Sequence, residues 1–191
     1  IIMAKEIGAD LTGMEFTQMI PTASPADGSL FTAVGGSAEI MAFVNKEGKR
    51  FVSEYEERDV ISKAAFEQED ALFFIIADKD LSSTVDYSGL EAAGYVYSAN
   101  TLEELAEKIG VPADTFVAEI ERYNSFCATG VDEDFGKPYF GPPIDEAPFV
   151  ATPRSPALHH TMGGVKIDTE ARVIDTNGSP IPGLFAAGEV C

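Results

Sequence analysis

Hydrophobic and polar positions along the chain predict a mixture of helices and short strands. An unbroken apolar run over residues 71–78, "ALFFIIAD", has the length and composition of a buried strand. Two amphipathic helices follow it. The first opens with the capping-box sequence at Thr101 and stops at Gly110, and the second runs from Pro112 to the region of Gly130. These patterns indicate an α+β fold.

Shorter elements flank these helices. Residues 1–8 are typical of the end of a helix, and 38–45 and 49–54 of two strands joined in a hairpin. Residues 58–68 have helical spacing. Residues 131–156 contain six prolines and are expected to form an extended connector. The chain then predicts two short strands, "GVKID" and "RVIDT", and a final apolar strand, "LFAAGEV".

Charge and composition exclude several classes of protein. The chain has 13 Lys and Arg against 32 Asp and Glu, a net charge of −19, which argues against nucleic acid and anionic membranes as partners. Its two cysteines make neither a disulfide framework nor a metal knuckle, and no motif places metal ligands at suitable spacing. We therefore expect no metal site. No apolar run has the length of a membrane span.

Three stretches are candidates for chemistry, namely residues 53–62, 157–168 and 182–190. Their simplest interpretations are a solvated charge run, a surface loop and a buried strand with an exposed glutamate. Arg58 would otherwise be a permanent cation aimed at a carboxylate. In "ALHHTMGGVKID" the glycine pair allows close approach of a flat group, and adjacent histidines of an extended segment point to opposite faces.

Together these stretches resemble the FAD-dependent fumarate reductase family, which includes flavocytochrome-type fumarate reductases and urocanate-type reductases. The carriers are "VNKEGKRFVSE" followed by "RD", then "HHTMGGVKID", then "PIPGLFAAGEV", in that order. The resemblance covers nearly the whole chain. It implies a central fragment, with residues 17–154 as the capping domain and residues 1–16 and 155–191 as parts of the flavin domain. The family's glycine-rich nucleotide fingerprint would precede Ile1, and a substrate-binding arginine would follow Cys191.

The resemblance also implies roles for individual residues. Arg58 matches the proton donor and His159 the histidine that holds a substrate carboxylate. His160 matches a neighbour of the flavin, and Glu189 a glutamate at the FAD. Gly163 and Gly164 are expected to line the cofactor. The implied reaction reduces an activated carbon–carbon double bond, with hydride from flavin N5 and a proton from Arg58. FAD is expected in the full-length protein, and the isolated fragment is expected neither to hold it nor to be active.

The chain departs from the family at one wall of the substrate site. In "QMIPT", Ile20 stands where the family has a substrate-binding histidine, and a Ser-Glu-x-x-Arg group falls on Ala33, Val34 and Ser37. This wall would be apolar, with Ile20 and Val34 facing the substrate. We therefore predict a monocarboxylate or another activated alkene, and not fumarate, as the substrate. The proton must also reach Arg58 by another route, for which the candidates are Glu54, Tyr55, Glu56 and Glu57.

Two other functions are compatible with the sequence. A ketosteroid-dehydrogenase-like flavoenzyme would share the fold, but that branch usually relies on tyrosines, and the presence of Arg58 and His159 argues against it. A non-catalytic acidic binding module is permitted by the charge of −19. A haem or FMN electron-donor domain outside this chain is compatible with the resemblance. The sequence does not identify a cellular compartment.

Overall fold

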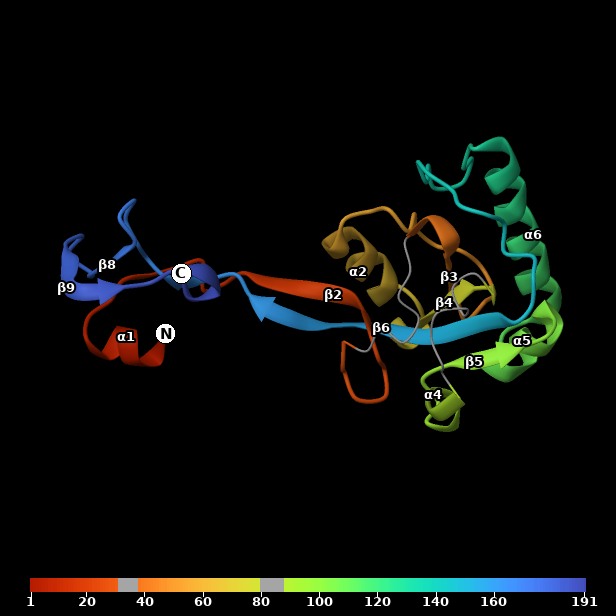
Figure 1. Cartoon of the computed structure of the whole chain (residues 1–191), viewed down its shortest axis with the longest axis horizontal. Coiled ribbons are helices and arrows are strands. Elements are labelled where there is room, and N and C mark those ends of the chain that lie inside the picture. Colours follow the sequence, from red (N-terminus) through yellow and green to blue (C-terminus); the bar gives the residue numbers. More distant parts are fainter. Residues whose placement is uncertain (31–37, 80–87) are drawn as a thin grey trace. The chain divides into compact units, whose positions relative to one another are not determined.

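The structure, a computed structural model, describes residues 1–30, 38–79 and 88–191 (Figure 1). It divides into two compact units. Unit 1 consists of Ile1–Met19 and Leu158–Cys191, and unit 2 of Ile20–Ala157. The expected division after residues 16 and 154, into parts of a flavin domain and a capping domain, stays a prediction.

Unit 2 is built on an antiparallel sheet. Its strands are β2 (Thr17–Ala23), which begins in unit 1, β3 (Ala42–Asn45), β4 (Phe73–Ala77), β5 (Tyr97–Ala99) and β6 (Phe149–Thr161), which ends there. Their order is β2-β6-β4-β3, and β5 also pairs with β6. Strand β4 is antiparallel to both neighbours, with Phe74 opposite Val44 on β3 and Pro153 on β6. The predicted buried strand is thus confirmed as an interior strand.

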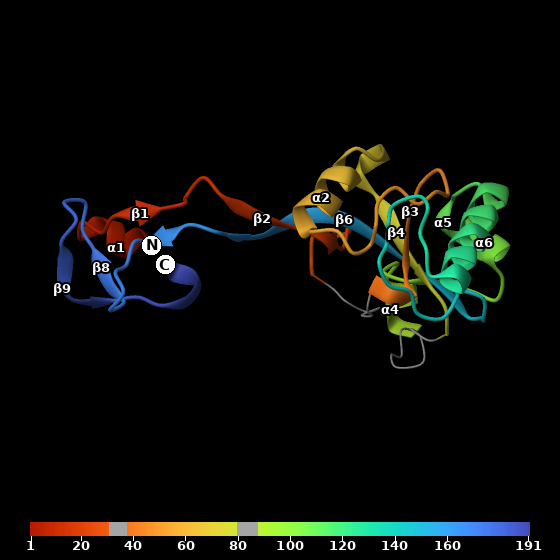
Figure 2. The same cartoon turned by 90° about the horizontal axis from the view of Figure 1, so that it is seen from above.

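Helices cover both faces of this sheet (Figure 2). On one face lie α5 (Leu102–Ile109) and α6 (Ala113–Thr129), and α2 (Arg58–Phe66) lies on the other. Because successive strand residues point to opposite faces, Phe74 and Ile76 enter the core under α5 and α6, while Phe73 and Ile75 enter the core under α2. This double burial explains the unbroken apolar run. The helices are α2 (Arg58–Phe66), α4 (Ser88–Ala92), α5 (Leu102–Ile109) and α6 (Ala113–Thr129), with short 3₁₀ turns at Ala38–Ile40 and Glu69–Ala71.

The two predicted amphipathic helices are confirmed. The side-chain oxygen of Thr101 accepts a hydrogen bond of 3.1 Å from the backbone N–H of Glu104 at the start of α5. Gly110 and Gly130 end the two helices in the left-handed conformation, at φ 73° and 71°. This conformation favours glycine, because it brings a side chain's Cβ close to the backbone. The buried face of α6 consists of Phe116, Ile120, Tyr123 and Phe126.

Three predictions about strands are wrong. Residues 49–54 form no strand: β3 pairs with β4, and only one isolated bridge, Val44 to Arg50, remains of the expected hairpin. The connector predicted over 131–156 contains the start of β6, the longest strand, because a proline removes one donor without preventing extended backbone. The final strand ends at Phe185, and Gly188–Val190 form a 3₁₀ turn.

Unit 1 holds two small strand pairs. Its elements are α1 (Ile2–Glu6), β1 (Leu11–Thr12), β7 (Gly164–Val165), β8 (Arg172–Ile174), β9 (Pro180–Phe185) and the terminal 3₁₀ turn. β1 pairs with β7, and β8 with β9. Their core is formed by Ala9, Val165 and Val173. An apolar cavity of about 560 Å³ opens between α1 and the β8–β9 segment. No helix in the described part of the chain is long and apolar enough to cross a membrane.

Candidate active site

Arg58 is the first residue of α2 and is exposed. Glu57 precedes it in an extended conformation, and no side chain caps this end of the helix. Backbone N–H groups in the first turn of a helix carry partial positive charge and have no partner within the helix, so they attract anions. The start of α2 therefore combines a guanidinium with an end of a helix that favours a carboxylate.

The segment that leads to Arg58 is only partly a solvated charge run. Glu56 and Glu57 are exposed, but Ser53 and Glu54 are buried. The side-chain and backbone oxygens of Ser53 accept from the backbone N–H groups of Tyr55 and Glu56, at 3.3 and 3.2 Å. These bonds form a turn that delivers the chain to the start of α2.

Tyr55, a candidate for the proton route, lies beside two groups from distant segments. Its ring packs edge to face on that of Tyr139, with 5.7 Å between centroids. Burial, followed by a hydrogen bond to Glu39, raises the pKa of Tyr55 to about 12. Tyr55 therefore holds its proton firmly at neutral pH. The proton route to Arg58 stays a prediction.

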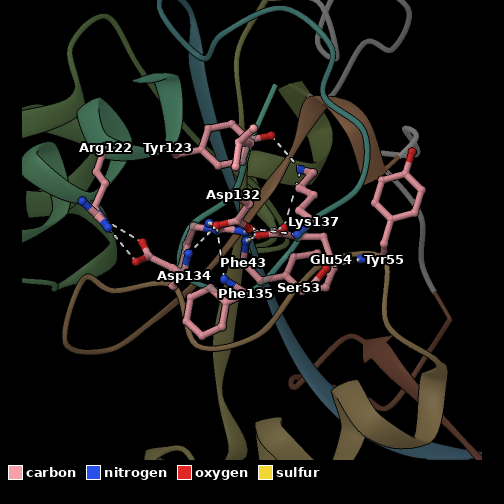
Figure 3. A network of polar contacts seen from close by, with 12 residues as sticks. Phe43, Ser53, Glu54, Tyr55, Arg122, Tyr123, Asp132, Asp134, Phe135 and Lys137 are labelled. Atoms are coloured by element: carbon pink, nitrogen blue, oxygen red, sulfur yellow. Dashed lines mark hydrogen bonds and ion pairs between the residues drawn. The ribbon is translucent and has the colours of Figure 1, made fainter. Parts of the chain in front are cut away.

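Glu54 belongs to a buried ion network (Figure 3). Arg50 donates to both oxygens of Glu54, at 2.9 Å each, and to both oxygens of Asp132, at 3.3 and 2.9 Å. The Nζ of Lys137 lies 3.5 Å from Glu54 Oε2 and donates to the hydroxyl of Tyr123 at 2.7 Å. The four charged side chains are fully buried. They contribute two positive and two negative charges, so the network is balanced.

Burial and pairing act in opposite directions on these groups. Burial disfavours the charged form of Arg50, but the hydrogen bonds and charges of Glu54 and Asp132 outweigh it and raise its pKa. Burial also opposes ionisation of Asp132, yet the bonds from Arg50 hold its pKa below the ordinary value. In Lys137 burial prevails and lowers the pKa. No local pattern in the sequence indicates this network, since Asp132 lies 82 positions from Arg50.

Of the two side chains predicted to form the apolar wall, one lies among the described residues. Ile20 is half-buried on β2. Val34 lies outside the described residues, as do Ala33 and Ser37. The role of this wall stays a prediction.

Sequence reasoning also missed Arg154. This residue is buried on β6 opposite Phe73, on the face of the sheet that α2 covers, and burial lowers its pKa to about 10. The strand register, once known, would have placed it there.

In unit 1 the two histidine rings contact each other. Their centroids are 4.9 Å apart at 70°, edge to face, so they do not point to opposite faces as predicted. His159 Nδ1 lies 2.7 Å from Gln18 Oε1. His160 Nδ1 lies 3.0 Å from the carbonyl of Thr161 and 3.4 Å from Glu189 Oε1. If His159 donates from Nδ1 to Gln18, its Nε2 is left for a ligand.

Gly163 and Gly164 are buried against backbone. A Cβ at Gly163 would lie 2.4 Å from the carbonyl group of Gly13, and one at Gly164 would lie 2.3 Å from the carbonyl oxygen of Val190. Both distances are far shorter than real contacts, so packing within unit 1 already requires glycine. Their contact with the cofactor stays a prediction, as do the ligand roles of His159, His160 and Glu189.

Two polar side chains of unit 1, those of His160 and Glu189, lie close to each other. Glu189 is exposed and His160 half-buried, and their carboxylate and imidazole suit hydroxyl, N–H and carbonyl partners. The chain contains no G-x-G-x-x-G sequence for the diphosphate. Among the described residues, no group of three or more His, Cys, Asp or Glu is placed to hold a metal ion.

Comparison with known proteins gives consistent matches. The family described as FAD binding domain matches residues 1–191. The NADH:acrylate oxidoreductase of Vibrio harveyi is 46% identical over the whole chain, which spans 19% of that protein. The urocanate reductase of Eggerthella lenta is 38% identical over 98% of the chain, which spans 32% of that protein. The chain therefore spans a third or less of these relatives.

A solved structure has a similar fold. The open conformation of a flavocytochrome c3 fumarate reductase superimposes with a TM-score of 0.74 and 36% identity, over 99% of this chain and 34% of the other. The mixed helix and sheet architecture therefore resembles that of a flavocytochrome fumarate reductase.

Proposed function

This chain belongs to the family of FAD-binding domains, and we propose that its parent protein reduces the activated double bond of an unsaturated monocarboxylic acid. Unit 2 would be the capping domain, and unit 1 a part of the flavin domain. The observation that carries the proposal is the start of α2, where an exposed arginine stands at a helix end that no side chain caps. Such an end suits one carboxylate and one developing negative charge.

The flavin, when bound, supplies hydride to the substrate's β-carbon. Negative charge then develops on the α-carbon and its carboxylate, which the guanidinium of Arg58 stabilises electrostatically. Arg58 donates the proton that the α-carbon takes up, and solvent or a neighbouring acid restores it. His159 binds the substrate carboxylate through Nε2, while Gln18 holds the ring at Nδ1.

Ile20 supports a substrate with a single carboxylate. A half-buried aliphatic side chain offers no hydrogen bond, so a second carboxylate beside it would lose hydration without compensation. The relative from Vibrio harveyi is named for acrylate, an acid with one carboxylate and a short alkene. Acrylate and its small apolar homologues are thus the substrate class we propose.

The test uses the full-length flavoprotein, reduced viologen as electron donor, and acrylate, fumarate and a 3-ketosteroid as substrates. We expect turnover with acrylate at least about tenfold above fumarate, and Ile20→His to narrow that ratio. Arg58→Lys should reduce turnover about 10²-fold or more, within the range for a positioned proton donor. Lys63→Arg, on the same helix, is the control. Preference for fumarate or the steroid would overturn the substrate class, and full turnover of Arg58→Lys would overturn the proton donor.

A further inference from the structure

We infer that the buried network of Arg50, Glu54, Asp132 and Lys137 is a positioning device for Arg58. The inference rests on the proposed function, because it assigns these residues an effect on turnover that acts only through Arg58. None of the four is proposed to touch the substrate.

The network ties the segment before α2 to two distant parts of unit 2. Glu54 Oε1 accepts from the backbone N–H of Phe43 on β3, at 3.0 Å, and from Arg50 Nε. Arg50 also donates to Asp132, which follows α6 in the chain. Asp132 in turn accepts from the backbone N–H groups of its own loop, at Asp134, Phe135 and Lys137. The Glu54 carboxylate is therefore held from both sides.

Strand β3 also holds the other end of α2. The side-chain amide of Asn45 donates to Gln68 Oε1 at 2.9 Å, just beyond the last turn of the helix, and Gln68 donates to the carbonyl of Ala64 at 3.0 Å. Phe43 and Asn45 are two residues apart on one strand. The apolar face of α2 fixes its distance from the sheet, and these two polar tethers oppose sliding along it.

Only three residues separate Glu54 from Arg58, and the Ser53 turn leaves this linker little freedom. A shift of the Glu54 anchor would therefore move the first turn of α2. Misplacement of a reacting group by about 1 Å can cost on the order of 10²-fold in rate, without a matching loss of substrate binding.

The experiment is a double-mutant cycle in the full-length flavoprotein. Glu54→Gln keeps the shape but loses the charge. We expect kcat to fall about 10- to 100-fold, with KM changed less than about threefold and an unchanged flavin spectrum. In an Arg58→Lys background the same substitution should lower kcat less than about twofold, because the group that it positions is already replaced. Asp134→Asn, on the same loop but outside the network, is the matched control and should change neither constant.

Equal losses in both backgrounds would overturn the inference, since they would show an effect independent of Arg58. If Glu54→Gln fails to fold, Arg50→Lys retains the positive charge without the two-pronged bond and should give the same coupling. Loss of flavin in both variants would show that the network serves only folding, which also rejects the inference. Failure of the proposed function appears separately, as full turnover of the single Arg58→Lys variant.

Discussion

Replacement of Arg50 by methionine should destabilise the chain strongly. The substitution removes four hydrogen bonds to two fully buried carboxylates and leaves Glu54 and Asp132 with Lys137 as the one cation of the network. One buried negative charge is then uncompensated. Breaking a buried ion pair from one side typically costs about 3–5 kcal/mol. For a chain of this size that loss lowers the melting temperature by roughly 6–20 °C.

A matched control lies in the same region. Arg122 donates two hydrogen bonds to Asp134, at 2.6 and 2.7 Å, and lies 4.9 Å over the ring of Phe126. Arg50 likewise lies 5.2 Å over Tyr123. The side chain of Arg122 is 47% exposed, whereas that of Arg50 is fully buried. Because exposed ion pairs contribute little, Arg122→Met should leave the melting temperature almost unchanged.

Thermal unfolding of the 191-residue chain, followed by far-ultraviolet circular dichroism, measures both changes. A third variant tests the cause. Adding Glu54→Gln to Arg50→Met restores the charge balance, with Asp132 against Lys137, and should recover part of the loss. The reasoning is refuted if Arg50→Met costs no more than Arg122→Met. It is also refuted if the double variant is less stable than Arg50→Met alone.

Three further predictions concern acid stability, a glycine contact and a helix cap. Burial opposes ionisation of Asp132, but the bonds from Arg50 hold its pKa below the ordinary value. The native state therefore binds fewer protons at Asp132 than the unfolded state, and stability falls as the pH drops through the ordinary pKa range of an aspartate. Asp132→Asn should reduce the slope of unfolding free energy against pH, below about pH 4, by up to one proton. Urea titration at several pH values measures this slope. An unchanged slope would contradict the lowered pKa of Asp132. Gly163→Ala, whose Cβ would meet Gly13, should lower the free energy of unfolding by about 1–3 kcal/mol. Gly89→Ala, whose Cβ would have nothing within 4 Å, should be neutral or stabilising. Equal melting temperatures of the two variants would argue against the contact between Gly163 and the backbone of Gly13. Thr101→Ala removes the α5 cap and should cost about 1 kcal/mol, and Thr101→Ser should retain most of it.

The sequence alone determined the features that depend on neighbouring residues. The cap at Thr101, the stop at Gly110 and the amphipathic face of α6 are local patterns, and the structure has them where the pattern predicts. The continuous apolar run identified β4, because a strand buried on both faces has no polar position. The three motifs indicated the family from the sequence alone, because such motifs are recognised by the identity and order of their residues.

Only the tertiary structure decided which charged residues are buried and which partners they have. Glu54 and Glu56 are both glutamates of one short run, yet one is locked in an ion network and the other is exposed. The proline-rich stretch became a strand because β4 and β5 pair with it, and Gly163 is needed because Gly13 lies against it. Each of these outcomes depends on contacts between distant segments. Chain folding creates such contacts, and no local pattern records them.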